Sequence, residues 1–186
     1  MALEIERKFL VRDVSGEGAL PAWKRLAEDP EGTLYRQGYL SRDPDRTVRV
    51  RIAGDKARLT VKGRTTGCTR SEFEYPIPLE DARRMLDELV LSPVLEKRRY
   101  RVPFAGYVWE VDEFDGENRG LVVAEVELGS ETETPELPDW AGKEVTGDVR
   151  YYNSALSENP YARWNTEDAF IRGWKVAIVL PSLSSI

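Results

Sequence analysis

Residues 3–11 read Leu-Glu-Ile-Glu-Arg-Lys-Phe-Leu-Val, and Glu4, Glu6 and Lys8 stand at alternate positions within this run. Successive side chains of a β-strand point to opposite faces, so in a strand Glu4, Glu6 and Lys8 lie on one face. Two carboxylates at this spacing are hard oxygen ligands of the kind that bind Mg²⁺ or Mn²⁺, and a nearby lysine can contact a phosphoryl oxygen. The run therefore predicts a site for a metal and a phosphate, although an ordinary exposed strand edge can show the same pattern.

The same alternation recurs along most of the chain. Turn signals such as Asp43-Pro44-Asp45 and Phe104-Ala105-Gly106 separate the alternating runs and are short enough to join neighbouring strands as hairpins. The pattern predicts about eight strands in a mostly antiparallel sheet, over residues 3–12, 33–42, 47–53, 57–63, 69–77, 94–103, 106–114 and 121–128.

Helical patterns are few. The sequence predicts helices over residues 21–28, 79–90 and 151–157, and in the second of these the apolar residues repeat at helical spacing, which indicates core packing. We expect one domain over residues 1–163 and a C-terminal tail of unassigned role over residues 164–186. The tail's five-residue apolar run is far too short to cross a bilayer, which takes about 20 residues.

The composition excludes several classes of enzyme. The chain of 186 residues contains no histidine, which removes Ser-His-Asp and Cys-His centres, His-ligated zinc and imidazole acid–base chemistry. Cys68 is the single cysteine and cannot form an intramolecular disulfide, and no signal peptide stands out, so we expect a cytoplasmic protein. The net charge of -6 argues against a nucleic-acid partner.

Nearly every predicted strand has one face that is almost wholly charged. On a solvated strand face Ser, Thr, Asn and Gln usually accompany the charges, whereas here they are rare. The charges also separate by strand, with arginines on one and glutamates on another. These positions are Glu4, Glu6, Lys8, Arg49, Arg51, Lys62, Glu72, Glu74, Lys97, Arg99, Arg101, Glu110, Asp112, Glu125 and Glu127.

Two folds explain such faces. One is a half-solvated antiparallel sheet that is apolar on its buried side and polar outside. The other is a sheet that closes into a barrel with its charged face inside, where about eight strands leave room for side chains or one small ligand. Buried charges are costly unless they are paired or bound to ions, so a charged lumen would be a binding site. Lysines and arginines suit several phosphates and carboxylates suit a divalent metal, so a linear triphosphate with metal meets both needs.

At these residues the sequence resembles the triphosphate tunnel metalloenzymes, also called the CYTH superfamily. Glu4, Glu6 and Lys8 match the defining Glu-x-Glu-x-Lys, and further matches follow in order on the predicted strands as far as Val123-Ala-Glu-Val-Glu-Leu128. Residues 145–153 are similar to bacterial members in which a C-terminal helix plugs one mouth of the tunnel. The resemblance covers residues 1 to about 163. It implies an α+β fold, in which an eight-stranded antiparallel β-barrel with a charged lumen carries a few helices outside and a plug helix.

The resemblance also implies a role for each charged position. Glu4, Glu6 and Glu127 would be direct metal ligands, and Glu125 would help to bind a second metal or orient the attacking water. The cations that would bind the substrate are Lys8, Arg49, Arg51, Lys62, Lys97, Arg99 and Arg101. The carboxylates that would support these cations or the metal are Glu72, Glu74, Glu110 and Asp112.

The implied reaction is hydrolysis of inorganic tripolyphosphate with Mg²⁺ or Mn²⁺, with nucleoside triphosphates as further substrates. Family members also include class IV adenylyl cyclases and thiamine triphosphatases, and fold alone does not choose among them. Many cyclase-type members have a histidine before the signature, which this chain lacks. A non-catalytic polyphosphate-binding or nucleotide-binding module is a further alternative, but it would need cations more than carboxylates. Family members are often dimers, so a homodimer is also expected.

Overall fold

The computed structural model describes residues 2–12, 19–66 and 69–164. Within these ranges the chain forms strands β1 (Ala2–Val11), β2 (Thr33–Ser41), β3 (Arg46–Ala53), β4 (Lys56–Gly63), β5 (Thr69–Pro76), β6 (Leu91–Phe104), β7 (Tyr107–Phe114), β8 (Val122–Glu127) and β9 (Ala141–Glu144). The α-helices are α1 (Ala22–Leu26), α2 (Leu79–Glu88) and α3 (Asn153–Leu156), and the 3₁₀ turns are η1 (Gly116–Asn118), η2 (Val149–Tyr151) and η3 (Tyr161–Arg163).

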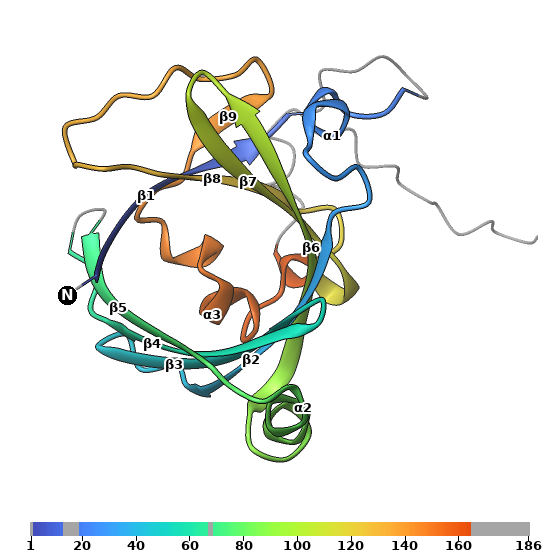
Figure 1. Cartoon of the computed structure of the whole chain (residues 1–186), viewed down its shortest axis with the longest axis vertical. Coiled ribbons are helices and arrows are strands. Elements are labelled where there is room, and N and C mark those ends of the chain that lie inside the picture. The colour runs from blue at the N-terminus through green and yellow to red at the C-terminus, as the bar shows by residue number, and fades with distance from the viewer. Residues whose placement is uncertain (1, 13–18, 67–68, 165–186) are drawn as a thin grey trace, which may run out of the picture.

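The sheet closes on itself. Its strand order is β5-β4-β3-β2-β6-β7-β8-β1-β9, and β5 also pairs with β1, so that eight strands form a ring (Figure 1). Every pairing in the ring is antiparallel. The predicted eight-stranded barrel is therefore confirmed. The short ninth strand, β9, pairs with the second half of β1 and was not predicted.

The apolar residues of the strands point outward, where the helices and loops cover them. On β3, Val50 and Ile52 are buried together with Ala82 and Leu86 of α2, which packs on the outside of the barrel (Figure 1). A second outer cluster contains Trp109 of β7, which stacks edge-on against Trp140 before β9. Because the outward-facing positions of each strand are apolar and make these contacts, the alternate, charged positions face the lumen.

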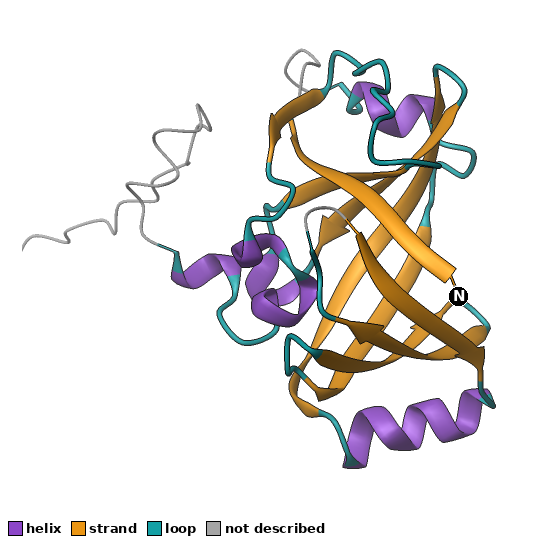
Figure 2. Ribbon diagram, turned by 90° about the vertical axis from the view of Figure 1, so that its left-hand side faces the viewer, coloured by secondary structure: helices purple, strands orange, loops and turns teal. Residues whose placement is uncertain are grey.

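One end of the barrel is closed by the C-terminal part of the described chain. Figure 2 shows the short helices around α3 at that end, and Figure 1 shows α3 inside the outline of the ring. Leu95 of β6 and Val123 of β8 point to the same face of their strands as the charged residues do, and they pack there with Tyr151 and Leu156. The lumen therefore changes from charged to apolar toward this plug.

A tight hairpin shapes the wall between β6 and β7. Ala105 and Gly106 form its two-residue loop, and both have positive φ angles, of 48° and 82°. Two positive φ values are characteristic of the type I′ turn, whose twist matches that of the flanking strands. Gly106 has no Cβ to strain in this region, and it lies on the wall of the central cavity.

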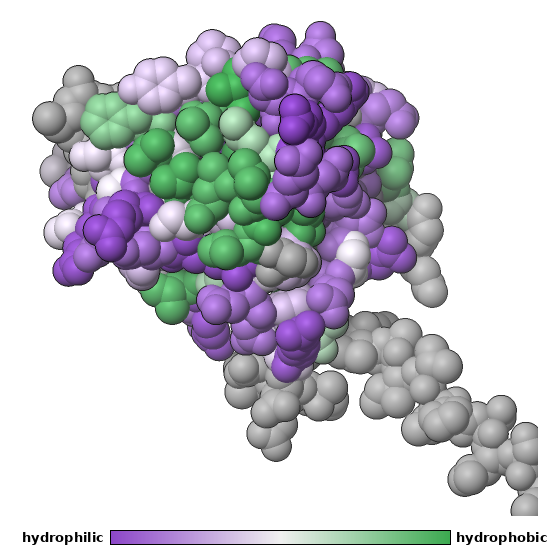
Figure 3. Space-filling view, turned by 90° about the horizontal axis from the view of Figure 1, so that it is seen from below, coloured by the Kyte–Doolittle hydropathy of each residue, from purple (hydrophilic) through white to green (hydrophobic). Residues whose placement is uncertain are grey.

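The outer surface carries exposed apolar side chains. Figure 3 shows the molecule from below, the side on which α2 lies in Figure 1, and apolar side chains gather on that face. Leu89 and Leu91, which follow α2 in the chain, are exposed. No helix in the described residues is long and apolar enough to cross a membrane. Cys68 and the tail after residue 164 lie outside the described residues, so the predicted boundary at residue 163 stays a prediction.

Candidate active site

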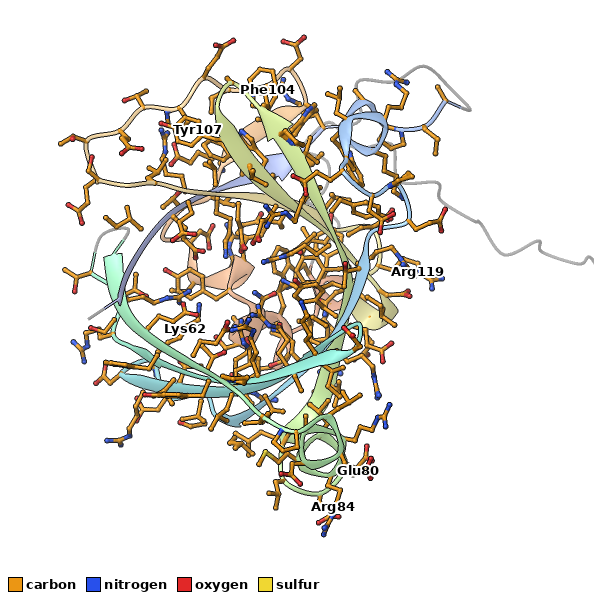
Figure 4. The ribbon with its side chains drawn as sticks, in the orientation of Figure 1. Lys62, Glu80, Arg84, Phe104, Tyr107 and Arg119 are labelled. Carbon is orange, nitrogen blue, oxygen red and sulfur yellow. The ribbon has the colours of Figure 1, made fainter. Side chains whose placement is uncertain are left out.

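The barrel encloses a cavity of about 600 Å³ lined mostly by charged and aromatic side chains. Figure 4 shows Lys62 of β4 pointing into the ring, whereas Glu80 and Arg84 of α2 lie outside it. The predicted site residues that line the cavity are Glu6, Lys8, Arg49, Arg51, Lys62, Glu72, Glu74, Arg99, Arg101, Glu110, Glu125 and Glu127. The alternation of the sequence thus gathers residues from seven of the eight barrel strands around one space, because each strand turns its charged face inward.

Two glutamates face one another on neighbouring strands. Glu6 of β1 lies directly opposite Glu127 of β8 in the register, and both line the cavity. Glu127 forms no ion pair with the residues that the structure describes. Like charges opposite one another in a sheet destabilise it, so a cation between them would relieve the repulsion.

This carboxylate pair fits a divalent metal. Within the described residues no three His, Cys, Asp or Glu side chains converge on one metal position. Mg²⁺, however, is usually bound through one or two carboxylates and completes its shell with water and substrate phosphates. Glu4 lies two positions before Glu6 on β1, but its side chain lies outside the described ones. The two facing glutamates are the donors that the structure offers for such an ion.

Glu125 is held by two cations. Its carboxylate lies 2.8 Å from Nζ of Lys8 and accepts a hydrogen bond of 2.9 Å from Nη2 of Arg99. Burial acts to raise the pKa of Glu125, but the attraction of Lys8 and then of Arg99 outweighs it and holds this pKa well below the ordinary value. The same attraction by Glu125 and by Glu6 raises the pKa of Lys8 despite its burial. Both groups are therefore charged at neutral pH.

A second carboxylate, that of Glu74 on β5, contacts arginines of β3 and β4. It accepts a hydrogen bond of 2.8 Å from Arg51 and lies 3.7 Å from Arg49 and 3.0 Å from Arg58. The fully buried hydroxyl of Thr60 donates to the same carboxylate and accepts from Arg49. Glu74 thus fixes the arginines of β3 at the cavity wall.

Lys97 and Asp112 do not line the cavity. They form an ion pair in which each side chain is only 1% exposed. Asp112 also accepts hydrogen bonds of 2.7 and 2.6 Å from Arg99, which does reach the cavity. Lys97 in turn donates to Asn153 of the plug, at 3.4 Å. The pair therefore supports Arg99 and connects the barrel wall to α3.

The pKa of Lys97 predicts how stability depends on pH. Burial lowers it from 10.5 to about 8, against the opposing attraction of Asp112. Since the pKa in the unfolded chain is higher, the unfolded state binds more protons between these values, and the free energy of unfolding should rise with pH across them. Denaturation of the wild type at several pH values from about 8 to about 10.5 should show this rise, and Lys97→Met should show a smaller one. Equal slopes for both proteins would contradict the lowered pKa.

Several cavity residues were missed from the sequence. Arg70 lies in the predicted strand over residues 69–77 and points to the same face as Glu72 and Glu74, and its Nη2 lies 3.5 Å from Glu6, but it was not assigned to the site. Tyr35 and Tyr39 share one parity on β2 and also line the cavity, although their strand has no charge on that face. All three residues could have been found from the sequence, because they occupy the inward-facing alternate positions of their strands.

The plug also contributes to the wall. Tyr152, Asn153 and Ser154 line the cavity, and the ring of Tyr152 lies 5.5 Å from Nζ of Lys8. Arg101 lies at the rim, where its side chain is 56% exposed and pairs with Glu28 at 3.0 Å.

A closed antiparallel barrel with cations and facing carboxylates in its lumen defines a tunnel-like class of anion-binding proteins. The model of the CYTH domain family matches residues 2–154, so the chain belongs to this family and the resemblance found in the sequence is confirmed. An inorganic triphosphatase of Acetivibrio thermocellus is 53% identical over 161 residues, which cover 87% of this chain and 97% of that protein.

A second relative and a solved structure agree with this match. The inorganic triphosphatase of Nitrosomonas europaea is 36% identical over 163 residues, which cover 83% of this chain and 96% of that protein. A crystal structure of an inorganic triphosphatase is 33% identical with a TM-score of 0.55, and the match covers 84% of this chain and 95% of the other.

Proposed function

We propose that this chain hydrolyses inorganic triphosphate to phosphate and pyrophosphate inside the barrel, with Mg²⁺ or Mn²⁺. The observation that carries the proposal is the joint presence, in one cavity, of facing carboxylates and of cations from several strands. A site that only bound anions would not need Glu127, which lies opposite Glu6 and forms no ion pair among the described parts of the chain. The relatives named as inorganic triphosphatases support the same reaction.

The cations would bind the phosphoryl oxygens. Arg49, Arg51 and Arg99 present guanidinium groups, whose planar forks match pairs of phosphate oxygens. Lys8 and Lys62 would add point charges along the same wall, and Arg101 would act at the rim. Each cation already has a carboxylate partner, such as Glu72 for Lys62 at 2.7 Å, which keeps it oriented before the substrate arrives.

Glu6 and Glu127 would hold the metal, with Glu4 as a third ligand. The bound metal would neutralise charge on the transferring phosphoryl group and polarise the bond that breaks. The attacking water forms a bond to the terminal phosphorus while the bridging P–O bond breaks, pyrophosphate leaves with the electron pair of that bond, and the proton that the water loses passes to a phosphate product or to solvent. Glu125 would orient the water by accepting a hydrogen bond, because its low pKa makes it a weak base. Fixed charges supply most of the rate enhancement in such a site.

The first experiment measures phosphate release from tripolyphosphate, ATP, thiamine triphosphate and pyrophosphate, each with Mg²⁺ or Mn²⁺. Tripolyphosphate should turn over fastest, and EDTA should abolish turnover because the metal is removed. Products from ATP are also tested for cyclic AMP, which would support the cyclase alternative. Tight binding of triphosphates without turnover in either metal would replace the proposal with a binding module.

Two further predictions from the sequence belong to this proposal. Cys68 is the single cysteine, which supports a cytoplasmic location. A homodimer is expected of the family, and analytical ultracentrifugation would test it.

A further inference from the structure

Tyr35 contacts two of the cavity's arginines through one aromatic ring. It lies on β2, between β3 and β6 in the sheet. The guanidinium carbon of Arg51, on β3, lies 5.3 Å from the centre of the ring, and that of Arg99, on β6, lies at the same distance. All three side chains line the cavity. The ring is thus shared between cations from the strands on either side of it.

This contact is favourable to both cations. The π-face of an aromatic ring carries partial negative charge, and a guanidinium within about 6 Å of its centre is attracted to it, more strongly when water is excluded. Arg51 and Arg99 otherwise repel each other, and burial together with the neighbouring Arg49 lowers the pKa of Arg51. A ring shared by both cations offsets part of this repulsion without adding a negative charge that would also repel a phosphate.

The two arginines differ in how they are held. Arg99 bonds to Asp112, Glu110 and Glu125, so its position is fixed by three carboxylates. Arg51 bonds to Glu74, which it shares with Arg49 and Arg58. The ring therefore acts mainly on Arg51, whose orientation relative to the fixed Arg99 depends on it.

We propose that Tyr35 is a positioning residue that sets the arrangement of Arg51 and Arg99, so that both guanidiniums bind one chain of phosphoryl groups. The inference rests on the proposed function, because it assumes that the cavity takes a triphosphate. It assigns the selectivity for a chain of phosphates over a single phosphate partly to this ring. Orthophosphate is too short to depend on the relative placement of two arginines, whereas tripolyphosphate depends on it.

The test measures binding by calorimetry in EDTA, so that no turnover occurs, with tripolyphosphate and with orthophosphate. Tyr35→Phe keeps the π-face and should bind tripolyphosphate within about twofold of the wild type. Tyr35→Leu removes the π-face and should weaken tripolyphosphate about tenfold while changing orthophosphate by less than about twofold. The melting temperature of each variant shows whether it is folded.

A second variant separates the π-face from shape. Replacing Tyr35 by 3,4,5-trifluorophenylalanine keeps the size of phenylalanine but weakens the negative face, so binding should fall between that of Tyr35→Phe and Tyr35→Leu. Equal binding by the phenylalanine and trifluorophenylalanine proteins would overturn the proposal. So would a loss in Tyr35→Phe as large as in Tyr35→Leu, since the hydroxyl would then be the group that acts.

The proposed hydrolase function and the proposed role of Tyr35 can fail independently of each other. If the wild type does not hydrolyse tripolyphosphate with either metal, the hydrolase proposal fails. If the wild type hydrolyses it and all Tyr35 variants bind it equally, the inference about Tyr35 alone fails.

Discussion

Replacing Glu127 by glutamine is expected to lower kcat for tripolyphosphate on the order of 10²- to 10³-fold, the loss typical of removing one group that stabilises a transition state. Glutamine keeps the size of the side chain but loses the charge that opposes Glu6 across the strands. The metal would then have one charged ligand from this pair in place of two. Steady-state phosphate release over a range of Mg²⁺ concentrations measures the change.

The control for this substitution is Glu136→Gln, which removes one negative charge from an exposed loop position. It should leave kcat within about twofold of the wild type, as expected for a surface substitution. Excess Mg²⁺ should restore part of the rate of Glu127→Gln if the loss is one of metal affinity. A Glu127→Gln protein with the kcat and the metal dependence of the wild type would remove this residue from the metal site.

Replacing Asp112 by asparagine is expected to lower the free energy of unfolding by about 3–5 kcal/mol, the cost of leaving a buried charge without its partner. Asp112 is the counter-charge of Lys97 and also accepts two hydrogen bonds from Arg99. Asparagine keeps the shape but not the charge, so two buried cations lose their shared partner. Urea denaturation at pH 7 measures the loss.

The matched control is Asp45→Asn. Asp45 forms an ion pair with Arg64 on the surface, where both side chains are largely exposed, and exposed pairs contribute little to stability. Its substitution should therefore change the urea midpoint far less than that of Asp112. Equal shifts for the two variants would mean that burial of the Lys97 pair does not govern its effect. Adding Lys97→Met to Asp112→Asn should recover part of the lost stability.

Much of the fold could be predicted from the sequence because strand alternation is a strong signal in this chain. All eight predicted barrel strands overlap strands of the structure. The ninth strand was missed because residues 141–144 are too few to show a period. The start of β6 at Leu91 was also missed, since Pro93 lies inside the strand and proline usually marks a strand end.

The site was predictable in its residue types but not in its contacts. The alternation of the sequence places Lys97 and Arg99 on one face of β6, yet of these two only Arg99 lines the cavity. Lys97 instead pairs with Asp112 on the neighbouring strand β7, and this depends on the register of β6 against β7, which the sequence does not give. Tyr35 and Tyr39 were missed because the search followed charge, whereas an aromatic ring can hold a guanidinium without carrying a charge.

The position of β1 in the sheet has a consequence for how the protein is made. This strand is synthesised before the other strands of the barrel, but it pairs with β8 and β9, which follow more than a hundred residues later. A nascent chain that ends before residue 122 can pair β2 with β3 and β3 with β4, but it cannot bring Glu6 opposite Glu127. Contacts so distant in sequence form slowly because the entropy of the intervening chain must be lost first. Ring closure and assembly of the acidic pair are therefore late events of folding, which wait until β8 has been synthesised.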